Sequence, residues 1–205
     1  MKGKENMMKK LLMAILLGAL ALTSCAGGGE PAPETKEQAP ETAAQEAMKI
    51  DTYTTWKDIT AYFHPETKLS EDEAKLQSQL KIFQVLGLAN GSESKEITHD
   101  SWGAIVNAFY PDFAADLAEE DMKRLEELPY GEDPYGVVAR GLARGEKDAK
   151  PLAVTTTTTG AEVLQAVDPE AYAAMSEEEK SALAKTTVLD GFAWGSQRFE
   201  FKPAE

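Results

Sequence analysis

Apolar residues recur at helical spacing in two similar stretches of the chain. Residues 55–65 read TWKDITAYFHP and residues 101–111 read SWGAIVNAFYP, and their Trp, Ile, Phe and Pro match at a constant offset of 46. Apolar residues at this spacing lie on one face of a helix. Each stretch therefore predicts an amphipathic helix of an internal repeat. We expect Trp56 and Trp102 to be buried at equivalent core positions.

A proline follows each of these helices and precedes a second helical stretch. Pro65 and Pro111 lack an amide hydrogen and disfavour helix in the residue before them, so we expect Phe113 in the connecting loop. Residues 111–125 (PDFAADLAEEDMKRL) align without a gap with residues 169–183 (PEAYAAMSEEEKSAL). The sequence thus predicts a third, weaker copy. We interpret the body as mainly α, built from tandem helical hairpins in one domain.

Short polar motifs mark the starts of the second helices. Residues 70–73 (SEDE) and 176–179 (SEEE) have the Ser-x-x-Glu pattern of a capping box. In the middle unit we expect Asp116 with Glu119 to take this role. The helix of the first unit should extend to Gly87 or to the Asn90-Gly91 pair. Its apolar face is expected to consist of Leu76, Leu80, Phe83 and Leu86.

The segments after the second unit are less regular. Residues 129–150 are rich in Pro and Gly, which predicts an irregular loop with a short helix near 137–142. Thr159, the last of five consecutive threonines, forms a capping-box pattern with Glu162 and predicts the first helix of the third unit. Residues 198–202 (RFEFK) alternate and predict a short C-terminal strand.

The first 25 residues follow another pattern. The first ten residues contain four lysines. Residues 11–21 then form an uncharged run that is shorter than the roughly 20 residues needed to span a bilayer. This order is typical of a cleaved secretory signal. The sequence Leu22-Thr23-Ser24-Cys25 resembles the lipobox of bacterial lipoproteins. The resemblance implies diacylglyceryl on Cys25, cleavage before it and attachment to a membrane. It covers residues 1–25 only, and an ordinary signal that ends near a cysteine is the alternative.

The sequence therefore divides into three segments: a signal peptide (1–24), a lipidated cysteine with a disordered tether (25–47) and a helical repeat domain (48–205). Residues 26–47 contain no aromatic or large aliphatic side chain, so they cannot bury enough surface to fold. Cys25 is the only cysteine, which excludes an intramolecular disulfide.

The charge of the chain limits its partners. Residues 1–24 contain four of the 21 basic and one of the 35 acidic residues, so the chain from Cys25 carries 17 basic and 34 acidic residues, net −17. A polyanion of this size repels nucleic acid and anionic lipid headgroups. We therefore expect no nucleic-acid partner and a membrane contact made through lipid alone.

Candidate catalytic and metal-binding groups are few. Acidic triplets at 71–73, 119–121 and 177–179 fall in the first turns of predicted helices, where carboxylates interact favourably with the helix dipole. We interpret them as caps rather than metal ligands. His64 and His99 are the only histidines, and a zinc site needs more ligands. The sequence predicts no catalytic residue, no metal ligand and no cofactor.

The loop at 129–150 holds the candidate contact residues. Tyr130 and Tyr135 are expected to be exposed, because loops lie on the surface. Arg140 and Arg144 belong to the densest basic cluster of an acidic body. This cluster is either a solvated helix face or a contact for an anion or partner. We take these four residues as candidates for a partner or anion contact.

Two functions fit these observations. The first is an extracytoplasmic, non-enzymatic helical domain that is held in the cell envelope by lipid and binds a protein or an envelope polymer. The second is an envelope hydrolase or sugar-processing enzyme in which the fold brings two carboxylates together. A pocket that holds two carboxylates with raised pKa values would favour the enzyme.

Overall fold

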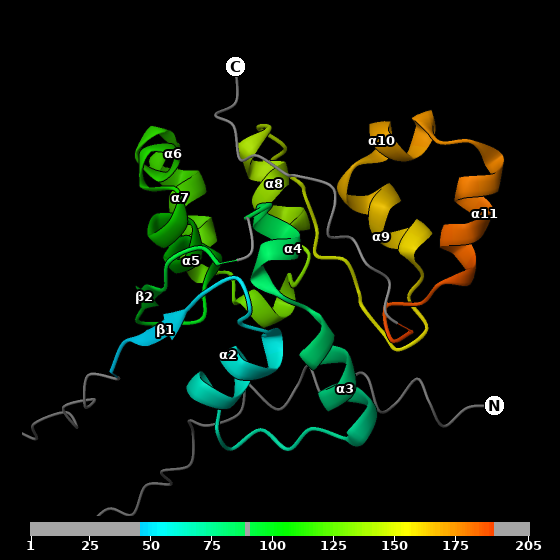
Figure 1. The fold of residues 1–205 in the computed structure, drawn as a ribbon. Helices are drawn as coiled ribbons and strands as arrows, with labels where there is room; N and C mark the ends of the chain where they lie inside the picture. Colours follow the sequence, from blue (N-terminus) through cyan, green and yellow to red (C-terminus); the bar gives the residue numbers. More distant parts are fainter. Residues whose placement is uncertain (1–45, 89–90, 191–205) are drawn as a thin grey trace, which may run out of the picture. The chain divides into compact units, whose positions relative to one another are not determined.

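The computed structural model describes residues 46–88 and 91–190, which belong to one compact unit and are mainly helical (Figure 1). The expected mainly α class is therefore confirmed. The expected signal peptide, Cys25, nearly all of the tether and the C-terminal strand at 198–202 lie outside the described residues. Within the described part, no helix combines the length and apolar character that crossing a membrane requires.

Three units share one architecture. Their first helices are α2 (Trp56–Phe63), α5 (Trp102–Phe109) and α9 (Gly160–Val167). Their last helices are α3 (Glu71–Gln79), α7 (Glu119–Glu127) and α11 (Glu177–Lys185). The second and third units insert a short helix between these two, α6 (Pro111–Asp116) and α10 (Pro169–Ala174). The predicted third copy is thus present.

The same backbone pairing closes each unit. Isolated antiparallel bridges join the residue before the first helix to a residue just beyond the last helix: Thr55 to Lys81, Ser101 to Pro129 and Thr159 to Thr187. In every unit the first amide of the first helix donates to the backbone oxygen of the residue before the bridged one. The N–O distances are 2.8 Å (Trp56 to Leu80), 2.9 Å (Trp102 to Leu128) and 2.9 Å (Gly160 to Thr186). This shared closure shows that the three units begin and end at equivalent positions.

Polar caps start most of these helices where the sequence predicts them. Thr55, Ser101 and Thr159 cap the three first helices through the amide three residues on. The capping boxes at 70–73, 159–162 and 176–179 are confirmed. The expected cap by Asp116 is wrong. Asp116 is the last residue of α6, and Ala118, the residue before α7, forms no side-chain hydrogen bond to that helix.

Two expectations about helix extent are also wrong. Pro111 begins α6, since the first turn of a helix needs no amide hydrogen there, and Phe113 lies buried in that helix instead of a loop. The helix after Ser70 stops at Gln79, because the bridge to Thr55 draws the next residues into extended backbone. A separate helix, α4 (Ile82–Leu86), follows, and Gly87 ends it in the left-handed conformation, as predicted.

The remaining elements pack against the first two units. Strands β1 (Met48–Ile50) and β2 (Lys95–Ile97) form a two-stranded antiparallel sheet, with Met48 opposite Ile97. A 3-10 turn, η1 (Tyr130–Glu132), and helix α8 (Val137–Ala143) follow the second unit. The short helix expected near 137–142 is therefore confirmed.

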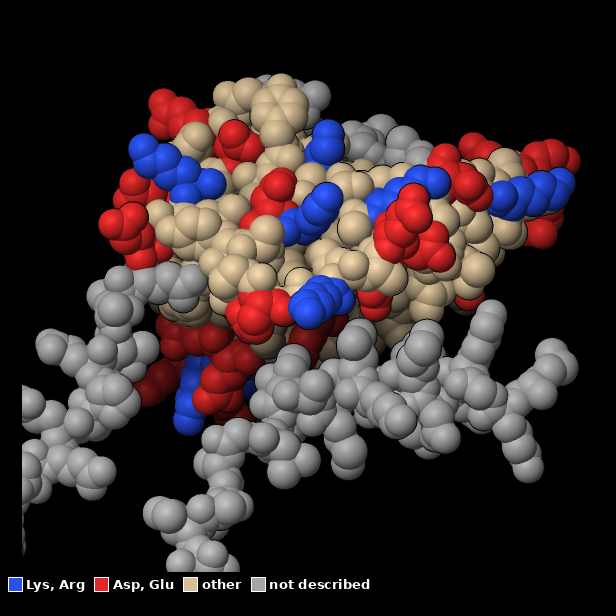
Figure 2. Space-filling view, turned by 90° about the horizontal axis from the view of Figure 1, so that it is seen from below, with Lys and Arg blue, Asp and Glu red and all other residues tan. Residues whose placement is uncertain are grey.

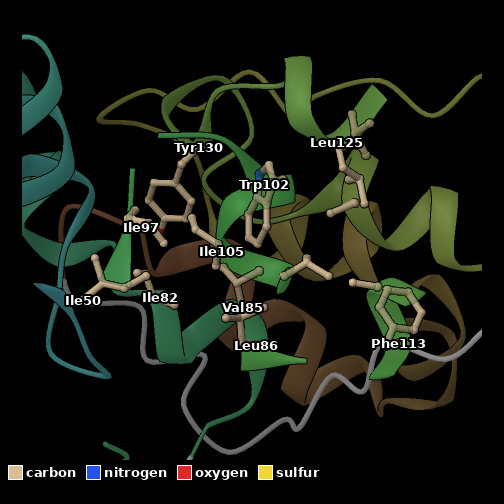
Figure 3. Close-up of a cluster of buried hydrophobic side chains, with 14 of the residues drawn as sticks. Ile50, Ile82, Val85, Leu86, Ile97, Trp102, Ile105, Phe113, Leu125 and Tyr130 are labelled. Atoms are coloured by element: carbon tan, nitrogen blue, oxygen red, sulfur yellow. The ribbon is translucent and has the colours of Figure 1, made fainter. Parts of the chain in front are cut away.

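Two clusters of buried side chains form the core. The larger joins the first two units, the sheet and α8, and contains Trp102 at its centre (Figure 3). The smaller joins α3 to the third unit through Leu76, Leu80 and Val163. The predicted burial of tryptophan is confirmed for Trp102, which is fully buried, whereas Trp56 is only partly buried and packs against both clusters.

The third unit offers a matched test of the repeat. Leu125 in α7 and Leu183 in α11 occupy equivalent positions, but Leu125 is fully buried and Leu183 is only partly buried. Leu125→Ala should lower the free energy of unfolding by about 2–5 kcal/mol, because it leaves a cavity. Leu183→Ala should cost about 1 kcal/mol. Urea unfolding of both variants measures the difference, and equal losses would contradict the described packing.

Candidate functional site around Asp133 and α8

The Pro- and Gly-rich loop folds into a buried polar cluster. Asp133 ends η1, and its carboxylate accepts hydrogen bonds from the amides of Val137 (2.7 Å), Val138 (3.0 Å) and Ala139 (3.3 Å). These amides begin α8 and have no partner within the helix. Asp133 is itself fully buried. Its carboxylate therefore holds the start of α8 in place from inside the core.

Trp102 fixes the other side of Asp133. The indole Nε1 donates to the backbone oxygen of Asp133 at 2.8 Å, and the Trp102 and Tyr130 rings lie 5.2 Å apart at a tilt of 52°. In Figure 3 Tyr130 lies beside Trp102 in the larger core cluster. The cluster thus ties the second unit to the segment that follows it.

Three of the four candidate contact residues are buried. Tyr130, Tyr135 and Arg140 are 0%, 2% and 5% exposed, so the expected exposure of the two tyrosines is wrong. For Tyr130 the reason is the closure of the second unit, in which the Tyr130 amide donates to the Asp100 backbone oxygen at 2.5 Å and the side chain lies in the larger core cluster. Tyr130 and Tyr135 were candidates because they were expected to be exposed, so their burial removes the reason for selecting them.

Arg144 is the exposed member of the four. Its Nε donates to Glu146 at 2.9 Å, and both side chains are about half exposed. Arg140 instead turns inward, and its Nη2 donates to the Val85 oxygen at 3.2 Å. The structure therefore separates the two arginines that the sequence grouped together.

Burial shifts the pKa values of the cluster. Desolvation raises the pKa of Asp133 to about 7, although the three amide bonds and the positive charge of Arg140 oppose that rise. Desolvation likewise lowers the pKa of Arg140 to about 9 and raises the pKa values of Tyr130 and Tyr135 above their ordinary range. Sequence reasoning missed Asp133. Its place just before the predicted helix at 137–142 is the signal that could have identified it as a cap.

The hydrogen bonds of the Asp133 carboxylate all serve to hold the start of α8. Both carboxylate oxygens of Asp133 accept bonds from α8, and neither is exposed to solvent. A group so placed cannot reach a substrate in this conformation. The cluster therefore explains how α8 is held, and it does not form an open active site.

The raised pKa of Asp133 predicts a pH dependence of stability. The folded state retains the Asp133 proton between the ordinary pKa of 3.8 and about 7, and unfolding releases it. The contribution of Asp133 to stability should then fall as the pH rises through this window and level off above pH 7. Asp133→Asn removes the titration. The free-energy difference between the two proteins, measured by urea unfolding from pH 4 to 8, should change by a few kcal/mol at most. A pH-independent difference would contradict the assignment.

Other ionisable groups also have local roles. His64 Nε2 and Asp100 Oδ2 lie 2.7 Å apart and join the end of α2 to the start of the second unit. The three acidic triplets occupy the first turns of α3, α7 and α11, as predicted. In the described ranges, no group of three or more His, Cys, Asp or Glu side chains is placed to hold a metal ion.

One hollow on the described surface has a volume of about 380 Å³. It is lined by Leu152, Ala153, Thr158, Glu162, Gln165 and Ala166. Its one carboxylate, that of Glu162, accepts the capping bonds of Thr159, which lower the pKa of Glu162. This hollow does not hold the pair of carboxylates with raised pKa values that would favour a hydrolase.

Comparison of the chain with protein-family models, with curated proteins and with solved structures finds no match.

Proposed function

We propose that this chain is a bacterial lipoprotein, anchored to a membrane of the cell envelope through Cys25, whose folded part is a non-enzymatic binding domain outside the cytoplasm. The observation that carries the proposal is the lipobox-like sequence Leu22-Thr23-Ser24-Cys25 directly after a basic and then apolar leader. Cys25 is also the only cysteine, so no internal disulfide competes for it.

The fold supports a binding role for the body. Two clusters of buried side chains join the three closed helical units, and Trp56 packs against both clusters. Repeat proteins likewise stack neighbouring units to present an extended surface. The strongly shifted carboxylate, Asp133, is used to hold α8. These features suit a rigid domain that binds a partner through its surface rather than an enzyme with a reactive site.

The surface charge suggests the kind of partner. On the face in Figure 2, acidic side chains lie in separate groups among uncharged residues, with Lys and Arg between them. With a net charge of −17 from Cys25 onward, the domain should avoid nucleic acid and bind neutral or basic surfaces. An envelope protein or a neutral envelope polymer fits this description. No observation in the described residues favours the alternative of a hydrolase with paired carboxylates.

Cell fractionation with palmitate labelling tests the proposal. The wild-type chain should incorporate labelled acyl groups and sediment with membranes, whereas Cys25→Ala should lose the label and remain as a longer precursor. Ser24→Ala is the matched control, because it keeps the cysteine and a small residue before it. An unlabelled wild-type chain that is processed like an ordinary secreted protein would refute the lipid anchor.

A further inference from the structure

The first and third units begin with the same local structure. Before α2, the Asp51 amide donates to Thr54 Oγ1 at 2.8 Å. Before α9, the Thr155 amide donates to Thr158 Oγ1 at 2.7 Å. The next residue in each unit caps the first helix and makes the bridge that closes the unit. These contacts relate the two units by a constant offset of 104 residues, from Thr54 to Thr158.

The offset pairs a large side chain in the first unit with a small one in the third. It places Ala166 of α9 at the position of Tyr62 in α2. Tyr62 reaches from α2 to the segment before β1, where its hydroxyl donates to the Glu46 backbone oxygen at 2.8 Å. The hollow of about 380 Å³ borders Ala166 and also Leu152 and Ala153, which precede α9 by as many residues as the first two residues of β1 precede α2. The hollow therefore lies between the two segments that Tyr62 bridges in the first unit.

The hollow suits an aromatic ring that carries a hydrogen-bond donor. Its lining combines three apolar residues with three that carry oxygen acceptors: Leu152, Ala153 and Ala166, and Thr158, Glu162 and Gln165. Its volume is within the range of about 300–1,000 Å³ that small-molecule pockets have, so an indole or phenol has room. Trp and Tyr combine an apolar ring with a polar group that needs a partner when it is buried. The sequence of α9 contains no aromatic residue, unlike those of α2 and α5.

The end of the described chain lies beside this hollow. The Val188 amide donates to the backbone oxygen of Thr158, a lining residue, at 2.8 Å. The Leu189 oxygen accepts a hydrogen bond from Gln79 Nε2 at 2.8 Å, which holds the next residue against α3. Figure 1 shows the red-orange end of the described chain beside the yellow segment that leads into α9. The residues that follow Asp190 therefore start within a short distance of the hollow.

We propose that the indole of Trp194 occupies the hollow beside Ala166 in the same chain and that its Nε1 donates to a side-chain oxygen of the lining. Trp194 is four residues beyond Asp190, and four residues of extended chain span up to about 14 Å. Residues 191–197 (GFAWGSQ) carry no charge that would have to be buried. Of the two aromatic residues in this stretch, Phe192 has no donor, whereas Trp194 has one. Trp194 thus gives the third unit the aromatic ring that Tyr62 gives the first.

The inference concerns the folded domain alone, so its failure would leave the lipid anchor untouched. It also assigns the hollow to the chain itself rather than to a small-molecule ligand.

Fluorine NMR of the full chain labelled with 5-fluorotryptophan tests whether Trp194 is covered. The loss of one signal in Trp194→Phe identifies the signal of Trp194. In the wild-type chain this signal should hardly shift between water and heavy water, because a docked indole is shielded from solvent. Ala166→Tyr puts into α9 the ring that α2 carries and should displace the indole, so that its signal gains the solvent shift of an exposed residue. Ala173→Tyr, at an exposed alanine of α10, is the matched control and should leave the signal unchanged.

Thiol alkylation tests the hollow with a smaller change at the same position. In Ala166→Cys, alkylation of the peptide that contains residue 166, followed by mass spectrometry, should become severalfold faster when Trp194→Ala is added, because the indole no longer covers the thiol. The same addition to Ala173→Cys should leave alkylation at residue 173 unchanged. Each measurement follows one peptide, so Cys25 does not interfere.

Three results would overturn the proposal. A Trp194 signal with a full solvent shift in the wild-type chain would show that the indole does not dock. A shielded signal that Ala166→Tyr leaves unchanged, or alkylation at residue 166 that Trp194→Ala does not accelerate, would show that the indole lies elsewhere. Shielding that disappears on dilution would identify a second copy of the chain as the source of the indole.

Discussion

Trp102→Ala should lower the free energy of unfolding by about 3–5 kcal/mol, a large share of the stability of an ordinary domain. Trp102 is fully buried at the centre of the larger core cluster, and its loss removes both a large apolar side chain and the Nε1 bond to the Asp133 oxygen. Urea unfolding followed by circular dichroism measures the change without depending on tryptophan emission.

Trp56→Ala is the matched comparison because Trp56 begins the equivalent helix of the first unit. Its indole packs against Gly131, where a Cβ atom would lie 2.5 Å from Nε1, but the side chain is only partly buried. We expect a smaller loss of about 1–2 kcal/mol, because less apolar surface returns to water. Equal losses at the two positions, or a loss below about 1 kcal/mol for Trp102→Ala, would contradict the described core.

Gly136→Ala should cost about 2–4 kcal/mol, because two separate penalties add at this position. Gly136 has φ near +60°, a conformation that L-residues with a side chain rarely adopt, and it precedes α8. A Cβ atom there would lie 2.6 Å from Val85 Cγ1 and 3.2 Å from the Trp102 ring. The added methyl group must therefore push into the larger core cluster, to which Val85 and Trp102 belong.

Gly91→Ala separates the two penalties. Gly91 also has a positive φ, of 84°, but a Cβ atom there would meet nothing within 4 Å. This variant should cost only the backbone term of about 1 kcal/mol. Val85→Ala combined with Gly136→Ala should recover part of the larger loss, since it removes the contacted methyl group. Equal effects of the two alanine variants in urea unfolding would contradict the close approach at Gly136.

Local patterns predicted much of this fold. Helix starts depend on short-range hydrogen bonds, so the Ser-x-x-Glu and Thr-x-x-Glu motifs located α3, α9 and α11 correctly. The offsets of 46 and 58 residues between the copies, taken from Pro65 to Pro111 and from Pro111 to Pro169, revealed the repeat because equivalent core positions need similar side chains. The break after Gln79 could not be read from the pattern, since it depends on the bridge from Lys81 to Thr55, a pairing distant in sequence.

The candidate site shows the same limit more sharply. Tyr130 and Tyr135 stand among Pro and Gly residues, which usually mark surface loops, but the closure of the second unit turns Tyr130 into the core. Arg140 and Arg144 are four residues apart on one short stretch, and only the packing of α8 against Val85 decides which of them is buried. Burial of polar residues is a tertiary effect, and a single sequence carries little signal for it.

Mass spectrometry of the N-terminal peptide of the mature wild-type protein, isolated from the membranes of its producing cells, tests the central claim most directly. The account predicts a peptide that begins at Cys25, lacks residues 1–24 and carries the added mass of diacylglyceryl on the cysteine sulfur. A mature chain with an unmodified Cys25, or one that begins at another residue, would contradict it.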